Sequence, residues 1–357
     1  MSVILKIDGK AHEGWKSVRI TRGLERVASD FDLTVTEKVA GTRDLPEIKP
    51  GKSCELLANG VLVVTGYVDE VNSQYDANSR SLTFRGRSKT GDLVDCSAVN
   101  EPGQWSDVNL AKIAADIAGP YGVSVVSPDT GENFSTFRLQ QGETAFSAIE
   151  RACRIRAFMA TDDGQGRLVL TRAGTRRAST QIRCSITDPE NSNVLTGSAS
   201  VSHRDRYSKY LMKGQSVGTD DLFGDDAASP SATATDSGIT RPRVLILQAE
   251  TQAVIGGLRD RVNWEASIRE GKALSLSYSL NGWAEADGTL WAPNVIASVV
   301  DDLNRIKGDF LVSEVSFSLD ERGQITTLSL VPPEAFALIP EGEHGGKTDT
   351  LSQYGLN

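Results

Sequence analysis

The chain has 357 residues, of which 39 % are hydrophobic and 24 % are charged, a composition typical of a folded protein with two or three domains. Its formal net charge of −9 argues against nucleic-acid binding, because contact with phosphates needs concentrated Lys and Arg. No segment approaches the roughly 20 apolar residues that cross a bilayer, and the N-terminus lacks the pattern of an export signal. We therefore expect neither membrane insertion nor Sec export.

The first segment, residues 1–97, is predicted to be a small antiparallel β-barrel. Residues 18–22 and 31–36 alternate apolar and polar side chains as strands do. A meander follows over residues 48–87, with a short strand, a tight turn at Asn59-Gly60, a longer strand and a hairpin return. No helical spacing interrupts this segment, which favours a barrel of short strands.

Residues 98–178 are predicted to form a compact α+β insert. Its first helix has Ser106 as the expected N-cap and stops at Gly119-Pro120. A second helix is expected from Glu143 onward, and a hairpin turn at 162–166 follows it. The apolar stripes are Leu110, Ile113, Ala114 and Ile117 in the first helix and Phe146, Ile149 and Cys153 in the second.

Residues 179–217 and 241–338 are predicted to form a second β-barrel domain that contains one helix, over 251–270. Within it, residues 293–331 repeat the order of the first meander: a short strand, a polar turn, a longer strand and a hairpin return. Residues 218–240 are expected to be a mobile loop, and residues 339–357 a loosely ordered C-terminal tail.

No arrangement of residues that would carry out chemistry is found in the sequence. The three histidines belong to no catalytic or metal-binding motif, and the four dispersed cysteines form no CxxC pair. The acidic pairs Asp220-Asp221 and Asp225-Asp226 lack the spacing of a calcium loop. The sequence therefore predicts no catalytic residue, no cofactor and no metal site, and a protein that is not an enzyme.

The two meanders together favour a protein that builds a ring over an enzyme with a single cleft. A closed ring needs contacts between subunits that return on themselves, and two equivalent modules in one chain would supply such contacts. The alternative is that two antiparallel meanders look alike without sharing any role.

Several runs of the sequence resemble the Mu-like bacteriophage baseplate hub proteins, within the late-control tail proteins of contractile phages. The resemblance covers most of the chain and is most specific over residues 86–97, with their Gly-Arg-Ser-x-x-x-Asp-Leu pattern. It is weakest over 218–240 and in the C-terminal tail. The other runs that carry it are residues 18–22, 31–35 and 64–69.

The resemblance implies a structural protein of the virion tail baseplate, made and assembled in the cytoplasm of the host bacterium. It implies a homotrimeric ring in which two similar barrels per chain adapt the sixfold tail tube to the threefold central spike. The expected partners are further copies of the chain, the spike, the tail tube and other baseplate proteins. The residues predicted for the interface between subunits are Gly86, Arg87, Ser88, Asp92, Leu93 and Asp95.

Two other functions stay open at this stage. A tail-associated cell-wall hydrolase would need paired carboxylates, for which Glu143 and Glu150 are the candidates. A glycan-binding tail protein would need exposed aromatic side chains, for which Trp283, Trp291 and Tyr67 are the candidates. Single aromatic residues near strand ends are more often part of a core or an interface.

Overall fold

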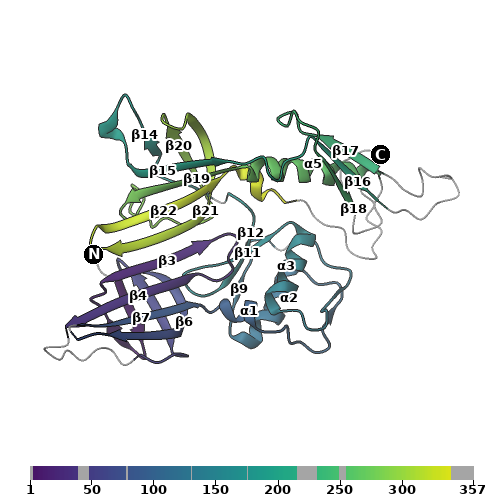
Figure 1. Cartoon of the computed structure of the whole chain (residues 1–357). Helices are drawn as coiled ribbons and strands as arrows, with labels where there is room; N and C mark the ends of the chain where they lie inside the picture. Colours follow the sequence, from purple (N-terminus) through teal and green to yellow (C-terminus); the bar gives the residue numbers. More distant parts are fainter. Residues whose placement is uncertain are drawn as a thin grey trace, which may run out of the picture.

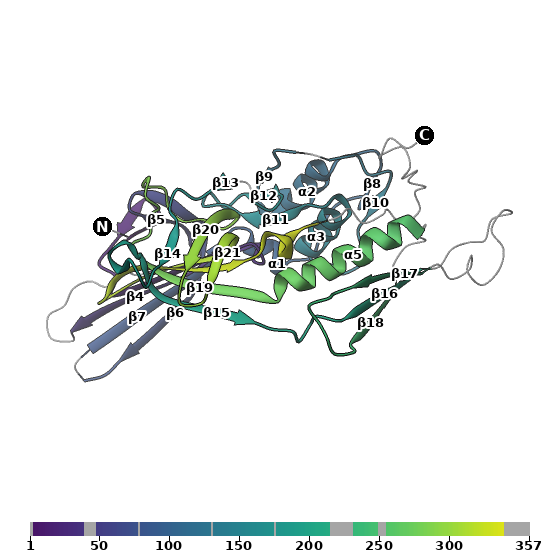
Figure 2. The ribbon, with the colours of Figure 1, turned by 90° about the horizontal axis from the view of Figure 1, so that it is seen from above.

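A continuous β-sheet joins the first strands of the chain to the last strands in the computed structural model (Figure 1). The structure describes residues 3–38, 48–77, 79–129, 131–174, 176–214, 231–248 and 255–338. The sheet follows the order β15-β19-β22-β21-β3-β4-β7-β6-β5-β1-β2, with β20, β13 and β14 continuing from β21. The chain is therefore mainly β, as predicted, and a helical insert and a small arm lie beside the sheet (Figure 2).

The N-terminal module is the part of the sheet formed by the first seven strands. Apolar side chains alternate along β1, β3 and β4, so one face of each strand is buried, with Ile20 and Leu33 at its centre. The β5–β6 hairpin turns at Asn59 and Gly60, both with positive φ, as the sequence predicted. The strands are β1 Val3–Ile7, β2 Lys10–His12, β3 Ser17–Gly23, β4 Asp30–Lys38, β5 Ser53–Ala58, β6 Val61–Tyr75 and β7 Ser79–Ser88.

The C-terminal module repeats the same strand order later in the chain. Its strands are β15 Val194–Val201, β19 Leu274–Asn281, β20 Val295–Asp301, β21 Ile306–Asp320 and β22 Gly323–Val331, with β13 Arg176–Arg177 and β14 Ile182–Cys184 beside β20. The order β15-β19-β22-β21-β20 matches β3-β4-β7-β6-β5 of the N-terminal module. The long strands β6 and β21 both have 15 residues, and each carries a bulge near its middle. The repeat predicted from the sequence is present in the strand pairing.

The expected pair of separate barrels is corrected by the way in which the two modules meet. The first half of β21 pairs with β20, whereas its second half, from Glu314 to Leu319, pairs antiparallel with β3. Because β21 extends beyond its own module, the two modules share one sheet and one hydrophobic core. No closed barrel is found among the described strands.

The α+β insert packs its helices around a second core. The predicted apolar stripes are buried there, except that Phe146 is only partly buried. Asn109, not Ser106, caps the first helix, because its Oδ1 accepts the Lys112 N–H at 2.9 Å. The elements are α1 Gly91–Asp95, β8 Gln104–Trp105, α2 Leu110–Ala118, η1 Gly119–Tyr121, β9 Val125–Val126, β10 Phe137–Arg138, α3 Ala145–Arg156, β11 Met159–Asp162 and β12 Leu168–Thr171.

A small arm extends from the C-terminal module, formed by the strands β16 Lys209–Lys213, β17 Ser231–Thr235 and β18 Val244–Gln248 against the helix α5 Ile255–Lys272. Residues 231–235 were expected in a loop, yet they form β17 and pair with β16. Residues 218–230, residues 251–254 of the predicted helix and the tail 339–357 lie outside the described residues. The remaining elements are η2 Pro189–Asn191 and η3 Pro333–Phe336.

Candidate assembly surfaces

The residues predicted for the subunit interface come together where the N-terminal module meets the insert. Gly86 and Ser88 lie in β7, which pairs with β4 on one side and with β6 on the other. Leu93 lies on α1 and is fully buried in the insert core. A Cβ atom on Gly86 would lie 2.1 Å from the Tyr67 carbonyl oxygen, so glycine is required for the close approach of β6. Gly86, Ser88 and Leu93 are therefore packed inside the chain.

The three charged residues of the predicted interface lie nearer the surface. The Arg87 guanidinium donates to Asp69 at 2.9 Å and to Asp95 at 2.7 Å, which ties α1 to β6. The bond from Arg87 lowers the pKa of Asp95, whereas partial burial raises the pKa of Asp92. These contacts lie within one chain. The role of all six residues between subunits stays a prediction.

A buried polar junction that sequence reasoning missed fastens the insert to the N-terminal module. The Asp162 carboxylate, at the end of β11, accepts from the Ser29 N–H at 2.9 Å and from the Ser29 hydroxyl at 2.8 Å. The Ser88 hydroxyl lies 3.1 Å from the same Ser29 N–H and 2.8 Å from the Thr90 hydroxyl. Burial raises the pKa of Asp162. No local pattern signals this contact, because its partners are far apart in sequence.

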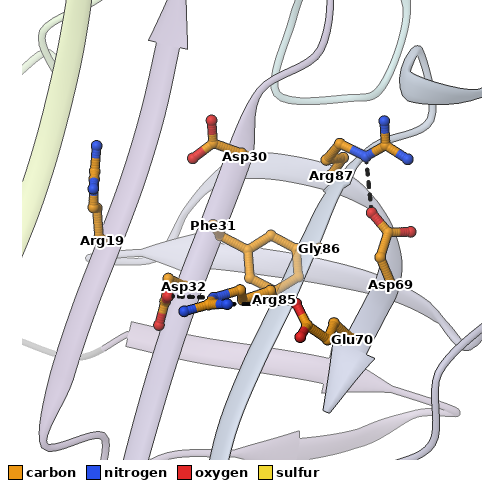
Figure 3. Close-up of a pocket in the computed structure, with 9 residues that line it drawn as sticks. All are labelled: Arg19, Asp30, Phe31, Asp32, Asp69, Glu70, Arg85, Gly86 and Arg87. Atoms are coloured by element: carbon orange, nitrogen blue, oxygen red, sulfur yellow. Dashed lines mark hydrogen bonds and ion pairs between the residues drawn. The ribbon is translucent and has the colours of Figure 1, made fainter. Parts of the chain in front are cut away.

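A charged hollow lies on the outer surface of the N-terminal module, over β3, β4, β6 and β7 (Figure 3). Arg85 bridges Asp32 at 2.8 Å and Glu70 at 3.4 Å. The other two carboxylates that line it also have arginine partners, Asp69 with Arg87 and Asp30 with Arg26. Each carboxylate that lines the hollow is thus held in an ion pair with an arginine.

Two strand edges lie open at opposite sides of the continuous sheet (Figure 1). Among the described residues, β15 pairs only with β19, and seven of its eight residues are exposed. Within the described part of the chain, the second half of β6, from Glu70 to Tyr75, pairs with β7 alone, because the pairing of β5 with β6 ends at Tyr67. Open edges offer unpaired N–H and C=O groups to another strand. Sequence reasoning named neither edge, because local spacing does not distinguish an open strand edge from a paired one.

Most of the residues proposed for the alternative functions are either ion-paired or buried. Glu143 accepts from Arg151 at 2.8 Å, and Glu150 lies 3.6 Å from Arg154. Trp283 and Trp291 are buried in the shared core, which confirms the core interpretation of both. The described part of the chain holds no cluster of three or more His, Cys, Asp or Glu arranged for a metal ion. Nor does any helix within it have the length and apolar character needed to cross a membrane.

Models of three protein families match successive parts of the chain. Residues 2–88 match the N-terminal part of the Mu phage baseplate assembly protein GpP-like family. Residues 90–172 match the second domain of the gp44-like baseplate hub proteins. Residues 256–339 match the fourth domain of the Mu phage baseplate assembly protein GpP.

Known proteins resemble the chain over nearly its whole length. The baseplate hub protein gp44 of Escherichia phage Mu is 34 % identical, over 100 % of this chain and 94 % of its own. The 43 kDa tail protein of prophage MuSo2 from Shewanella oneidensis has a TM-score of 0.85 at 31 % identity, covering 95 % of this chain and 100 % of its own. The E. coli type VI secretion component c3393, described as structurally similar to the T4 tail proteins gp27 and gp5, shares the fold, with a TM-score of 0.55 at 11 % identity over 94 % of this chain and 78 % of its own.

The family models and the sequence identity over the whole chain point to the same group of proteins. The chain belongs to the Mu gp44-like family of phage tail baseplate hub proteins.

Proposed function

We propose that the chain assembles as a homotrimeric ring at the centre of the phage tail baseplate. The observation that carries this proposal is the repeat of one module twice along the sheet, joined within the chain by β21 and β3. Three chains would then present six similar modules around a common axis, and the ring would keep true threefold symmetry. Such a ring fits between a sixfold tube and a threefold spike.

In this proposal the partners are the central spike, the tail tube and other baseplate proteins, and the ring is assembled in the host cytoplasm. The likeness to gp44, a baseplate hub protein, and to a type VI component compared with gp27 and gp5 supports this. The net charge of −9 favours assembly through specific patches over non-specific adhesion to nucleic acid.

The role proposed is structural and not enzymatic. The candidate carboxylates Glu143 and Glu150 each face an arginine, and two of the three candidate glycan-binding aromatics are buried. We expect no clearing on peptidoglycan zymograms. Clearing that is lost in a Glu143→Gln or Glu150→Gln variant would instead establish the hydrolase alternative.

Light scattering on a sizing column tests the oligomeric state directly. The chain has a mass of 38.4 kDa, and we expect three times this mass in solution. Averaged electron micrographs should show a ring with six similar lobes. A monomer at every concentration, with no ring upon addition of the spike, would contradict the proposal.

A further inference from the structure

The small sheet of the arm ends on one side in a strand with the composition of a sheet interior. Strand β18 begins with Val244, Leu245, Ile246 and Leu247, whereas β17, at the other edge, contains only serine, alanine and threonine. Among the described residues, β18 pairs with β16 alone. An unbroken run of large apolar residues is typical of a strand that is covered by its surroundings. The sheet therefore stops at a strand that is suited to a second neighbour.

The helix of the arm leaves β18 uncovered. α5 packs against β17 and β16, and β18 extends beyond it (Figure 2). On the outer face of the sheet, away from α5, Val244 is 56 % exposed and Ile246 is 60 % exposed. On the face toward α5, Leu245 and Leu247 are only partly buried. Open strand edges are usually protected by charged residues or proline, and β18 contains neither.

The free backbone groups of this edge follow from the hydrogen bonds on its other side. The Lys209 N–H donates to the Arg243 carbonyl at 3.0 Å. In a parallel pair of strands, residues that bond to the neighbour alternate with residues that do not. Leu245 therefore bonds to β16, whereas the N–H and C=O groups of Val244 and Ile246 face the open side.

Exposed lysines lie on the outer face of the same sheet. Lys209 and Lys213 are both exposed on β16, the strand next to β18. Within the described part of the chain neither lysine has an ion-pair partner, whereas the nearby Arg206 is paired with Asp236. Complementary charge across an interface favours one partner over others. A segment that carries carboxylates would supply the partners that these lysines lack.

We propose that the open edge of β18 is a docking site for an extended segment of another protein, in which apolar and acidic side chains alternate. Such a segment would add a strand to the sheet through the free backbone groups of Val244 and Ile246. Its apolar side chains would lie beside Leu245 and Leu247, on the face toward α5. Its acidic side chains would lie on the outer face, with the lysines of β16.

The spacing of strands brings these charges within reach of each other. Neighbouring strands lie about 4.8 Å apart, so an added strand would lie about 10 Å from β16. A lysine and a glutamate side chain, both extended over the sheet surface, can together bridge that gap. Lys209 is level with Val244 and Lys213 with Gln248, so the two cations lie at the two ends of the edge. A segment with one acidic residue near each end therefore fits best.

A labelled synthetic peptide tests the docking site on the full-length chain. Valine and glutamate alternate in the Val/Glu peptide, and lysine replaces every glutamate in the Val/Lys control. By fluorescence anisotropy in low salt, we expect the Val/Glu peptide to bind about tenfold more tightly than the control, with a smaller ratio in high salt. Equal affinities of the two peptides in low salt would overturn the proposal.

Proline substitutions at the two edges of the arm sheet form a matched pair. Ile246→Pro removes an N–H on the open side of β18, and Thr233→Pro removes one on the outer side of β17 in the same row of the sheet. The Thr233 N–H faces outward because the Asp236 N–H donates to the Ser208 carbonyl, at 3.2 Å, which fixes the alternation along β17. Edge strands tolerate proline at such positions.

The two variants should bind the Val/Glu peptide differently. We expect Ile246→Pro to weaken binding about tenfold, through the lost hydrogen bond and the bulk of the ring, and Thr233→Pro to leave it unchanged. Equal affinities of the two variants would overturn the proposal. If Ile246→Pro melts early, Lys209→Gln with Lys213→Gln replaces it, since this pair leaves the edge intact. That double variant should bind both peptides equally, and an unchanged preference for the Val/Glu peptide would also overturn the proposal.

Hydrogen exchange identifies what covers the edge. We expect the Ile246 amide to exchange quickly in the chain alone and slowly with the Val/Glu peptide, while the Thr233 amide stays the same. Slow exchange of Ile246 without peptide would overturn the proposal, because the chain itself or a second copy would then cover β18. Light scattering on the same samples tests the ring separately. Peptide binding by a chain that stays monomeric would leave the docking site standing and count against the ring.

Discussion

Replacing Gly86 by alanine tests whether the most specific run of the sequence acts within the chain. The added Cβ would lie 2.1 Å from the Tyr67 carbonyl oxygen and 2.5 Å from Cζ of Phe31. Overfilling a packed site costs about 1–3 kcal/mol, and a backbone carbonyl of a paired strand cannot rotate away as a side chain can. We therefore expect Gly86→Ala to lower the free energy of unfolding by about 3 kcal/mol.

Thermal unfolding by calorimetry and circular dichroism measures this loss. At roughly 2 to 4 °C per kcal/mol for a domain of 150 to 250 residues, the first transition should fall by about 6 to 12 °C. The matched control is Gly308→Ala in β21, where the nearest atom to the new Cβ is 3.6 Å away in the Phe310 ring. That variant should be neutral or slightly more stable, since alanine restricts the unfolded chain.

Equal melting temperatures for the Gly86→Ala and Gly308→Ala variants would refute this reasoning. A Gly86→Ala chain that melts normally but no longer forms trimers would support the interface role predicted from the sequence. A chain that melts early, with a trimer at low temperature, would assign Gly86 to packing between β6 and β7.

Three further changes test the junctions of the fold. Asn109→Ala should destabilise the insert by about 1 kcal/mol in urea unfolding, whereas Ser106→Ala should have no effect. A loss of stability in Ser106→Ala but not in Asn109→Ala would instead support Ser106 as the N-cap. Asp162→Ala should cost about 1–3 kcal/mol in the same assay by leaving buried donors unpaired. Burial raises the pKa of Asp162 in the folded chain, so the free energy of unfolding should fall as pH rises through that raised pKa. Asp162→Asn should remove this pH dependence. An unchanged profile of stability against pH would contradict the assignment. The hydrogen bond from Arg206 lowers the pKa of Asp236. The pair therefore stabilises the folded chain at a pH above the ordinary carboxylate pKa, and this stabilisation is lost as pH falls through the lowered pKa. The protection factors of the β17 amides against hydrogen exchange should therefore fall in acid in the wild type but not in Asp236→Asn. Equal acid sensitivity of the two proteins would count against the pair.

The continuous sheet changes how the repeat in the sequence is understood. Two closed barrels would each satisfy their own edges and would need separate contacts to form a ring. The structure instead uses the length of β21 to pair one module with the next, from Glu314 to Leu319. Among the strands that the structure describes, the repeat thus leaves one edge unpaired at each side of the sheet, on β15 and on the second half of β6.

The sequence by itself determined most strands of the sheet, the helices α2 and α3 of the insert, and the repeat. Alternation of apolar and polar residues depends only on local geometry, since side chains on a strand point to opposite faces. Resemblance over residues 86–97 identified the family that the comparisons show. The stripe from Leu110 to Ile117 likewise predicted a buried helical face that the structure contains.

Only the tertiary structure decided which strands share an edge. The pairing of β21 with β3 joins residues about 300 positions apart, and the bond between Ser29 and Asp162 joins two domains predicted separately. Nothing in local spacing encodes such partners, because they depend on how whole modules pack. The same holds for Val244 and Ile246, which become candidate contact residues only when the edge of β18 is seen to be open.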